Sequence, residues 1–178
     1  MHEVKHKLIR DMAAYIRDRG LGDASLRPLA RAAGTSDRML IYYFGTKKQL
    51  LADVLGFLAG ELANSLEAAL PTGPMRSHAE LITKVVEVLR TADMQGYFRV
   101  WLEIIAKASQ SGSAYVMLGA SIIDGFAGWL EKRIPETDAE PGKTAMAMLT
   151  LIEGVIVMDA AGRSSAADEA VRMLFKAS

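Results

Sequence analysis

The sequence contains no cysteine, which excludes a disulfide framework, a thiolate zinc site and a cysteine nucleophile. It also lacks a long uninterrupted apolar run. The most apolar stretch, residues 145–162, carries Glu153 and Asp159, so no membrane-spanning helix is expected. The first residues, MHEVKHKLIRDM, lack the apolar segment and cleavage site of a signal peptide. We therefore expect a soluble protein of the reducing cytoplasm that has no contact with a membrane.

Motifs of common enzyme classes are also missing. There is no Gly-rich dinucleotide or phosphate-binding loop and no Gly-x-Ser-x-Gly nucleophile elbow. His2 and His6 lie four residues apart but lack an evident third metal ligand, and Ser77-His78 is typical of a helix start rather than a nucleophile pair. We expect neither an enzyme nor a bound metal ion or cofactor.

The charge is unevenly distributed although its sum is zero. Residues 1–50 hold ten Lys or Arg against five Asp or Glu, whereas the remaining residues hold eleven against sixteen. A basic first part joined to an acidic remainder indicates an anionic partner for the first part only. Ordinary variation of surface charge is the alternative. With 178 residues, of which 51% are hydrophobic, the chain can bury a sizeable core.

Apolar residues recur at helical spacing along the whole chain. In the first segment Val4, Leu8, Met12 and Ile16 repeat every four residues, and no stretch alternates long enough to predict a strand. We therefore predict an all-α fold. After the N-terminal helix, the predicted helices lie near residues 26–33, 36–43, 50–70, 76–92, 95–109, 112–133, 142–161 and 165–177. Thr46 and Gln49 predict a reciprocal capping box at the start of the long fourth helix.

The second and third helices are short and are joined by Gly34 and Thr35. Gly34 can adopt positive φ where the helices cross sharply, which is typical of a helix-turn-helix motif, although other helical hairpins share this feature. In that motif the first helix lies across the phosphates and the second enters the major groove. Cationic and hydroxyl side chains around the pair suit phosphate contact, and Arg38 could reach guanine. These side chains are Ser25, Arg27, Arg31, Thr35, Ser36, Arg38, Tyr42, Tyr43, Lys47 and Lys48.

The segment LRPLARAAGTSDRMLIYYFGTKKQLLADVL, residues 26–55, resembles the DNA-binding region of the tetracycline-repressor (TetR) family. The resemblance covers residues 8–55 and includes caps, turn and core positions together. It implies a three-helix DNA-binding domain at residues 1–48 and a helical ligand-binding and dimerisation domain at residues 49–178, joined by a long helix. The rest of the chain is compatible with the family only in length and helicity.

The resemblance also implies roles for individual residues. Ser25, Arg27, Tyr42 and Lys47 resemble phosphate contacts, and Thr35, Ser36, Asp37, Arg38 and Met39 resemble positions that face the major groove. Tyr43 is a further candidate for DNA contact, although Tyr43 and Phe44 are more typical of core positions.

Three positions depart from the family pattern. The family often has Lys where this chain has Asp37, a small residue where it has Arg38, and a Tyr that contacts the DNA backbone where it has Ile41. A carboxylate at position 37 would repel phosphate. We expect DNA binding to survive these changes, but the operator sequence does not follow from relatives.

The second part of the chain is rich in methionine and aromatic residues, which adapt to varied apolar ligands. The predicted ligand-binding residues are Phe98, Trp101, Leu102, Ile105, Tyr115, Ile122, Phe126 and Trp129. Stripes at this spacing are also typical of a core. Glu103 is predicted to make a structural hydrogen bond, whereas Asp124 either contacts a polar ligand group or is exposed at a helix edge.

The helix near residues 142–161 is apolar nearly all round, so we expect it to be covered on more than one side. Together with the last helix it is the candidate for a two-fold interface that forms a four-helix bundle, as the family resemblance also implies. The predicted interface residues are Met148, Ile152, Gly154, Val155, Val171, Leu174 and Phe175.

These observations together predict a homodimeric transcription regulator, most simply a repressor. It binds a palindromic double-stranded DNA operator and is released by an unidentified small apolar or amphipathic effector. The alternative is a helical dimer that binds a ligand or a protein partner and carries a degenerate DNA-binding head.

Overall fold

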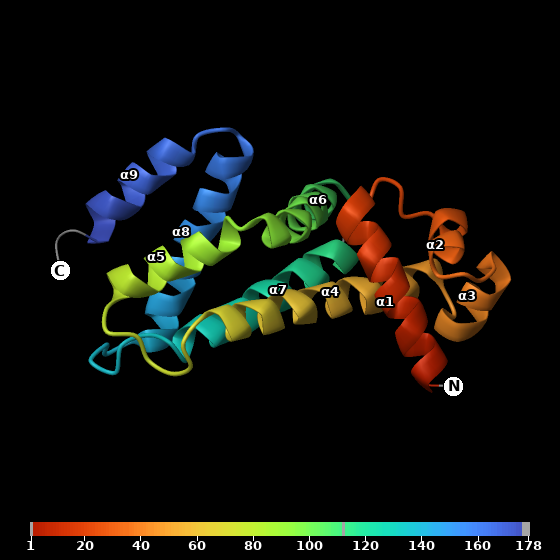
Figure 1. Cartoon of the computed structure of the whole chain (residues 1–178), viewed down its shortest axis with the longest axis horizontal. Coiled ribbons are helices and arrows are strands. Elements are labelled where there is room, and N and C mark those ends of the chain that lie inside the picture. The colour runs from red at the N-terminus through yellow and green to blue at the C-terminus, as the bar shows by residue number, and fades with distance from the viewer. Residues whose placement is uncertain (1, 112, 176–178) are drawn as a thin grey trace. The chain divides into compact units, whose positions relative to one another are not determined.

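The computed structural model describes residues 2–111 and 113–175, and within this part every regular element is a helix (Figure 1). This confirms the predicted all-α fold. None of the described helices combines the length and the apolar character needed to cross a membrane.

The N-terminal helices are α1 (His2–Arg19), α2 (Leu26–Ala32), α3 (Asp37–Phe44) and the long α4 (Lys47–Ala69). They are followed by α5 (His78–Leu89), a short 3-10 helix (Ala92–Met94), α6 (Gln95–Ser111), α7 (Ser113–Glu131), α8 (Pro141–Ala160) and α9 (Ser164–Phe175). Each α-helix differs from its predicted range by a few residues at most, whereas the short 3-10 helix was not predicted. The last two residues of the predicted helix 165–177 lie outside the described part of the chain.

The chain forms two compact units, and each unit is made of two separate stretches of the sequence. The first unit comprises the chain up to Asn64 together with Asp93–Ala120, and the second comprises Ser65–Ala92 together with the chain from Ser121 onward. The helix-turn-helix segment therefore shares a compact unit with α6 and the start of α7. The functional boundary between residues 48 and 49 stays a prediction.

The first unit is built around the periodic apolar face of α1. Met12 and Ile16 are fully buried, and α1 packs against both α2 and α6. Leu40 and Phe44 of α3 point inward, as their spacing predicts, and are 0% and 4% exposed. The segment formed by α2 and α3 is thus held by apolar contacts on one side, and its other side faces solvent.

In the second unit α8 packs against α5 and α9, so it is covered by two helices of its own chain. Arg90, directly after α5, forms ion pairs with α8 and with α9. Its Nε and Nη2 donate to the Asp159 carboxylate at 2.8 and 3.0 Å, and its Nη1 donates to Asp168 at 2.7 Å. The hydrogen bonds from Arg90 hold the pKa of Asp159 below its ordinary value.

Candidate nucleic-acid interface

The turn between α2 and α3 has the geometry that its glycine predicts. Gly34 adopts φ 64°, the Thr35 N–H donates to the Ala30 carbonyl at 2.9 Å, and the Gly34 N–H donates to the Arg31 carbonyl at 3.2 Å. This pair of hydrogen bonds is a Schellman motif, which satisfies the last carbonyls of α2 and requires a left-handed residue. It fixes the angle at which α3 leaves α2.

The start of α3 is capped by Ser36. Its backbone is extended, and its Oγ accepts a hydrogen bond from the Met39 N–H at 3.3 Å. Asp37 follows in the first turn, where a carboxylate interacts favourably with the helix N-terminus. This local gain gives Asp37 a structural role at the start of α3.

Ser25 occupies the N-cap position of α2, as predicted, but its side chain makes no capping hydrogen bond. The third residue of the helix is Pro28, which has no N–H to donate. The exposed Ser25 hydroxyl is therefore available to another partner, such as a phosphate oxygen.

The capping box at the start of α4 is only half formed. The Thr46 Oγ1 accepts a hydrogen bond from the Gln49 N–H at 3.1 Å, as predicted. The Gln49 side chain does not return to Thr46, because it donates to Asp53 at 2.7 Å, while the Thr46 N–H donates to the Phe44 carbonyl. The reciprocal half of the prediction is wrong because Asp53, a charged acceptor one turn ahead, captures the glutamine amide.

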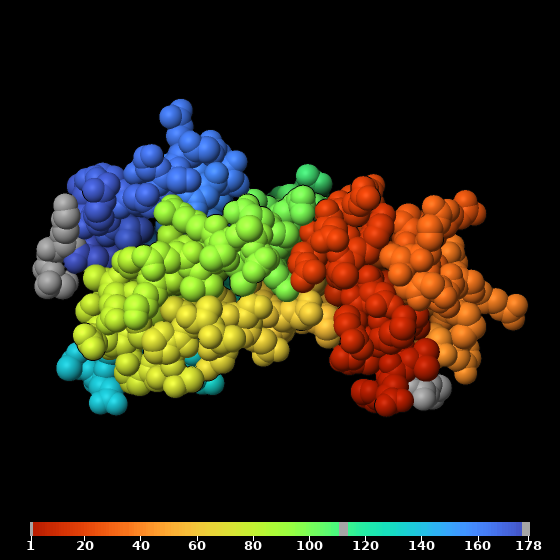
Figure 2. Space-filling view, viewed as in Figure 1, coloured from red at the N-terminus to blue at the C-terminus, as the bar shows by residue number. Residues whose placement is uncertain are grey.

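The cationic side chains around α2 and α3 are exposed and make no ion pair within the described residues. They are Arg27, Arg31, Arg38, Lys47 and Lys48. By contrast, Lys5 and Lys7 of α1 pair with Asp53 and Asp11 at 2.7 and 2.6 Å. Arg31, for example, pairs with no carboxylate among the residues that the structure describes. The space-filling view in Figure 2 shows the surface of α2 and α3 uncovered on its visible face.

The outer side of α3 is unusually apolar for an exposed surface. Tyr42 is 70% exposed, and Met39 and Ile41 are each 38% exposed. Apolar side chains on a recognition helix can contact thymine methyl groups, and a tyrosine hydroxyl can bind phosphate. Phe44, in contrast, is buried beneath the ammonium of Lys5, which lies 4.9 Å from the ring centroid. Phe44 is thus a core residue.

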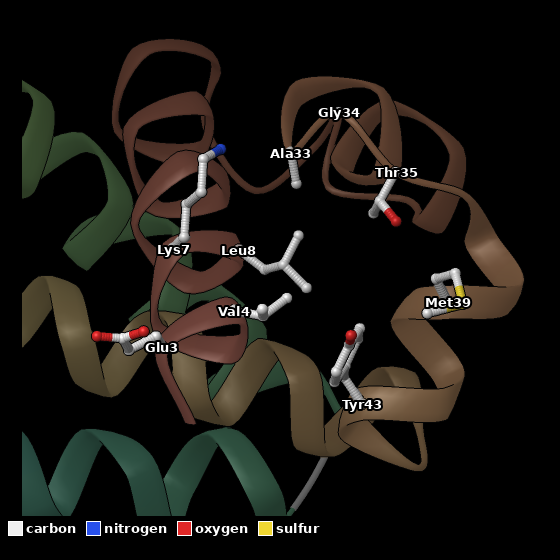
Figure 3. Close-up of a pocket in the computed structure, with 9 residues that line it drawn as sticks. All are labelled: Glu3, Val4, Lys7, Leu8, Ala33, Gly34, Thr35, Met39 and Tyr43. Atoms are coloured by element: carbon white, nitrogen blue, oxygen red, sulfur yellow. The ribbon is translucent and has the colours of Figure 1, made fainter. Parts of the chain in front are cut away.

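A groove of about 420 Å³ separates α1 from the turn and α3 (Figure 3). Val4 and Leu8 line it from α1, and Thr35, Met39 and Tyr43 line it from the opposite side. Tyr43 is half-buried and its side chain reaches into this groove, so it lies between the core and the exposed face. Three predicted DNA-contacting residues therefore border a single groove.

The predicted ligand-binding residues are divided between the two compact units. Five belong to the first unit, and Ile122, Phe126 and Trp129 belong to the second. The Trp129 indole N–H donates to Glu67 at 2.9 Å, and its ring lies 4.0 Å beneath the guanidinium of Arg133. The hydrogen bonds from Arg133 and Trp129 hold the pKa of Glu67 below its ordinary value. This structural network occupies the polar edge of Trp129.

The two acidic residues noted in apolar surroundings behave differently. Glu103 accepts hydrogen bonds from the backbone N–H groups of Leu21 and Gly22, which confirms its predicted structural role. Asp124 is exposed, in agreement with one of the two alternatives. Within the described residues no group of three or more acidic or histidine side chains could hold a metal ion.

Three predicted interface residues of α8 are already covered by their own chain. Met148, Ile152 and Val155 are only 2%, 3% and 7% exposed, because α5 and α9 pack over them. Among the other predicted interface residues, Gly154 and Leu174 are exposed. The exposed apolar residues of α8 and α9 also include Met146, Val157 and Met173, which were not predicted to lie in the interface.

Residues 13–54 match the family model of bacterial regulatory proteins of the tetR family. This segment contains α2, α3 and the start of α4, the part whose caps and turn are described above. The HTH-type transcriptional regulator BetI of Rhizobium meliloti is 30% identical over 114 residues, which are 62% of this chain and 55% of that protein. The helix-turn-helix segment of this chain is therefore similar to that of TetR-family regulators.

Further comparisons extend the similarity to the whole fold. BetI of Pseudomonas fluorescens is 31% identical over 81 residues, 44% of this chain and 41% of that protein, so the chain spans about half the length of the curated relatives it matches. A TetR-family transcriptional regulator from Rhodococcus sp. has a TM-score of 0.74 at 18% identity, covering 99% of this chain and 98% of that one. A TetR transcription regulator from Haloarcula marismortui has a TM-score of 0.65 at 18% identity, covering 98% and 95%.

These structural likenesses show that the second part of the chain also has the fold of TetR-family regulators. All four of these proteins are described as transcription regulators. These descriptions agree with the prediction of a transcription regulator.

Proposed function

We propose that this chain is a TetR-family regulator, which represses transcription as a cytoplasmic homodimer bound to a palindromic operator. The observation that carries the proposal is the set of exposed cations on the helix-turn-helix segment, none of which has an ion-pair partner among the described residues. Unpaired cations at a rigid surface suit phosphate, because no internal ion pair must be broken first.

Within this proposal the side chains divide into two roles. Ser25, Arg27, Tyr42 and Lys47 bind phosphates and set the register, while Thr35, Ser36, Asp37, Arg38 and Met39 face the base edges. Tyr43, which lies in the groove beside α1, contacts the sugar-phosphate backbone of the DNA. Arg38 is the side chain best suited to guanine, and Met39 is suited to a thymine methyl group.

The proposed dimer uses the exposed apolar side of α8 and α9. Val157 and Leu174 are 53% and 56% exposed, and a Cβ built at Gly154 would meet nothing within 4 Å, so a second helix can approach closely there. A two-fold axis would place the two recognition helices about 34–36 Å apart, which suits successive major grooves.

The proposed effector is a small apolar or amphipathic molecule that binds among the predicted ligand-binding residues of the first unit, which are Phe98, Trp101, Leu102, Ile105 and Tyr115. It weakens operator binding by favouring a conformation in which the DNA-binding segments of the two subunits no longer match the spacing of the half-sites. The size of this effect equals the difference between the affinities of the effector for the two conformations.

Selection from a random duplex pool at about physiological salt tests the proposal. Enrichment of a palindrome with half-sites about one helical turn apart is expected. Weak, salt-sensitive binding without any enriched sequence would favour the alternative, a ligand- or partner-binding dimer with a degenerate head, for which Asp37 and Ile41 are the supporting features.

A further inference from the structure

The loop between α1 and α2 is held by a carboxylate from a distant part of the sequence. Glu103 of α6 accepts hydrogen bonds on its Oε2 from the backbone N–H groups of Leu21 at 2.6 Å and Gly22 at 3.1 Å. Both donors lie in the short segment that leads from α1 into the helix-turn-helix. A charged acceptor shared by two backbone donors is among the stronger kinds of protein hydrogen bond.

The contact between α6 and the end of α1 leaves no room for a side chain at two glycines, Gly20 and Gly96. Gly20 has φ 83°, and a Cβ at this position would overlap the Glu103 carboxylate. On the facing side, a Cβ at Gly96 would lie 2.6 Å from Cγ and 2.9 Å from the carbonyl oxygen of Arg17. Two glycines, one on each side, thus allow α6 and the end of α1 to touch directly.

Two further contacts tie α6 to the end of α1. The Arg17 guanidinium donates to the Tyr97 hydroxyl at 3.1 Å and lies 5.5 Å from the centroid of its ring. The Arg99 guanidinium donates to the Arg17 carbonyl at 3.0 Å. The last turn of α1 and the loop after it are therefore bound to one helix by several polar contacts.

The two sides of α6 have different partners. Successive residues of an α-helix are rotated by about 100°, so Gly96, Arg99 and Glu103 share one side. By the same rotation the predicted ligand-binding residues Phe98, Trp101, Leu102 and Ile105 centre on the side roughly opposite. One helix thus presents the predicted effector side and the side that binds the loop before α2.

We propose that Glu103 is a positioning residue for DNA binding. By holding the Leu21 and Gly22 N–H groups it sets the position of α2 and α3 relative to α6. The inference rests on the proposed function.

The test combines amide hydrogen exchange with affinity for the operator that the wild type selects. In Glu103→Ala, exchange at Leu21 and Gly22 is expected to accelerate about tenfold or more, because these amides lose their acceptor. Operator affinity is expected to fall about threefold to tenfold, a range typical of coupled sites. Glu103→Gln keeps an acceptor oxygen, so its exchange rates at Leu21 and Gly22 and its operator affinity should lie between those of Glu103→Ala and the wild type. Glu87→Gln, at an exposed position of α5, is the matched control and should change neither quantity.

Two results would overturn the proposal. Unchanged exchange at Leu21 and Gly22 would mean that Glu103 does not hold the loop, and accelerated exchange with full operator affinity would mean that the loop does not position the DNA-binding surface. If Glu103→Ala does not fold, Glu103→Gln decides by the same two measurements. A wild type that selects no DNA, with accelerated loop exchange in the variant, would instead overturn the proposed function and leave the hydrogen-bond assignment intact.

Discussion

Arg38 and Tyr42 project from α3 into solvent, and neither makes a hydrogen bond or ion pair within the described residues. Their neighbours on the same helix, Leu40 and Phe44, are buried. An eight-residue helix thus separates residues that hold it in place from residues that are free to bind. Substitution on the free side should therefore change binding while leaving folding intact.

Arg38→Ala is expected to weaken operator binding by about 10- to 100-fold, since a bidentate contact between arginine and guanine contributes about 1–3 kcal/mol. The melting temperature should not change measurably. Fluorescence anisotropy with the selected operator and thermal unfolding would measure both quantities. Arg163→Ala, at an exposed arginine of the second unit, is the matched control; equal losses in the two variants would contradict the site assignment.

The Arg90–Asp159 pair provides a pH-dependent test of stability. The pKa of Asp159 is lowered in the folded state, so its contribution is present above the ordinary value of 3.8 and is lost as the pH falls through the lowered value. Asp159→Asn should therefore cost about 1–2 kcal/mol at neutral pH, and the difference from the wild type should close in acid.

Denaturant unfolding of the wild type and Asp159→Asn between neutral pH and pH values below 3.8 would measure this difference. Asp124→Asn, at an exposed residue without a charged partner among the described residues, is the control and should leave the free energy of unfolding at neutral pH unchanged. A difference for Asp159→Asn that persists unchanged into acid would show that the loss is not electrostatic.

At the scale of the element, the turn before α3 depends on one backbone conformation. Gly34 and Gly60 both have open space where a Cβ would be, but Gly34 has φ 64° whereas Gly60 lies within the helix α4. An alanine at position 34 would need a left-handed backbone, whereas an alanine at position 60 would keep a helical one. Neither Cβ would meet another atom within 4 Å.

Gly34→Ala should lower the free energy of unfolding by about 1–2 kcal/mol, because an L-residue is strained in the left-handed region. Gly60→Ala should raise it by about 0.5–1 kcal/mol, because alanine is the better helix former. Chemical denaturation of both variants measures the two shifts. A stabilising effect of both would mean that the turn tolerates another conformation.

At the scale of the whole molecule, self-association depends on which side of α8 remains free. The side carrying Met148 and Ile152 is covered by α5 and α9, so a partner can reach only the opposite side, which includes Val157. An exposed apolar surface of this kind is costly in water unless it is covered by another molecule.

Val157→Glu should convert the proposed dimer to a monomer, because it buries a charge at the interface. Sedimentation velocity would detect the change, and affinity for the full palindrome should fall because a monomer occupies one half-site. Met117→Glu, at a methionine that is 71% exposed in the first unit, serves as control. Dissociation by Met117→Glu instead would assign the interface to the first unit.

The sequence alone determined the helical fold, the glycine turn, the Ser36 cap and the inward positions of Leu40 and Phe44. Each of these depends on residues a few positions apart, where helical periodicity and capping chemistry are decisive. The exposure of Tyr42 followed from the same periodicity, since a residue two positions away from both Leu40 and Phe44 lies on the opposite side of the helix.

Only the tertiary structure decided which distant residues meet. Glu103 binds an N–H group 82 positions away, and Arg90 binds a carboxylate 69 positions away. For the same reason the covered side of α8 could not be predicted, because a helix that is apolar nearly all round carries no periodic signal for its buried face. Local patterns determine which helices form, whereas packing between helices selects which of their sides stay free to bind.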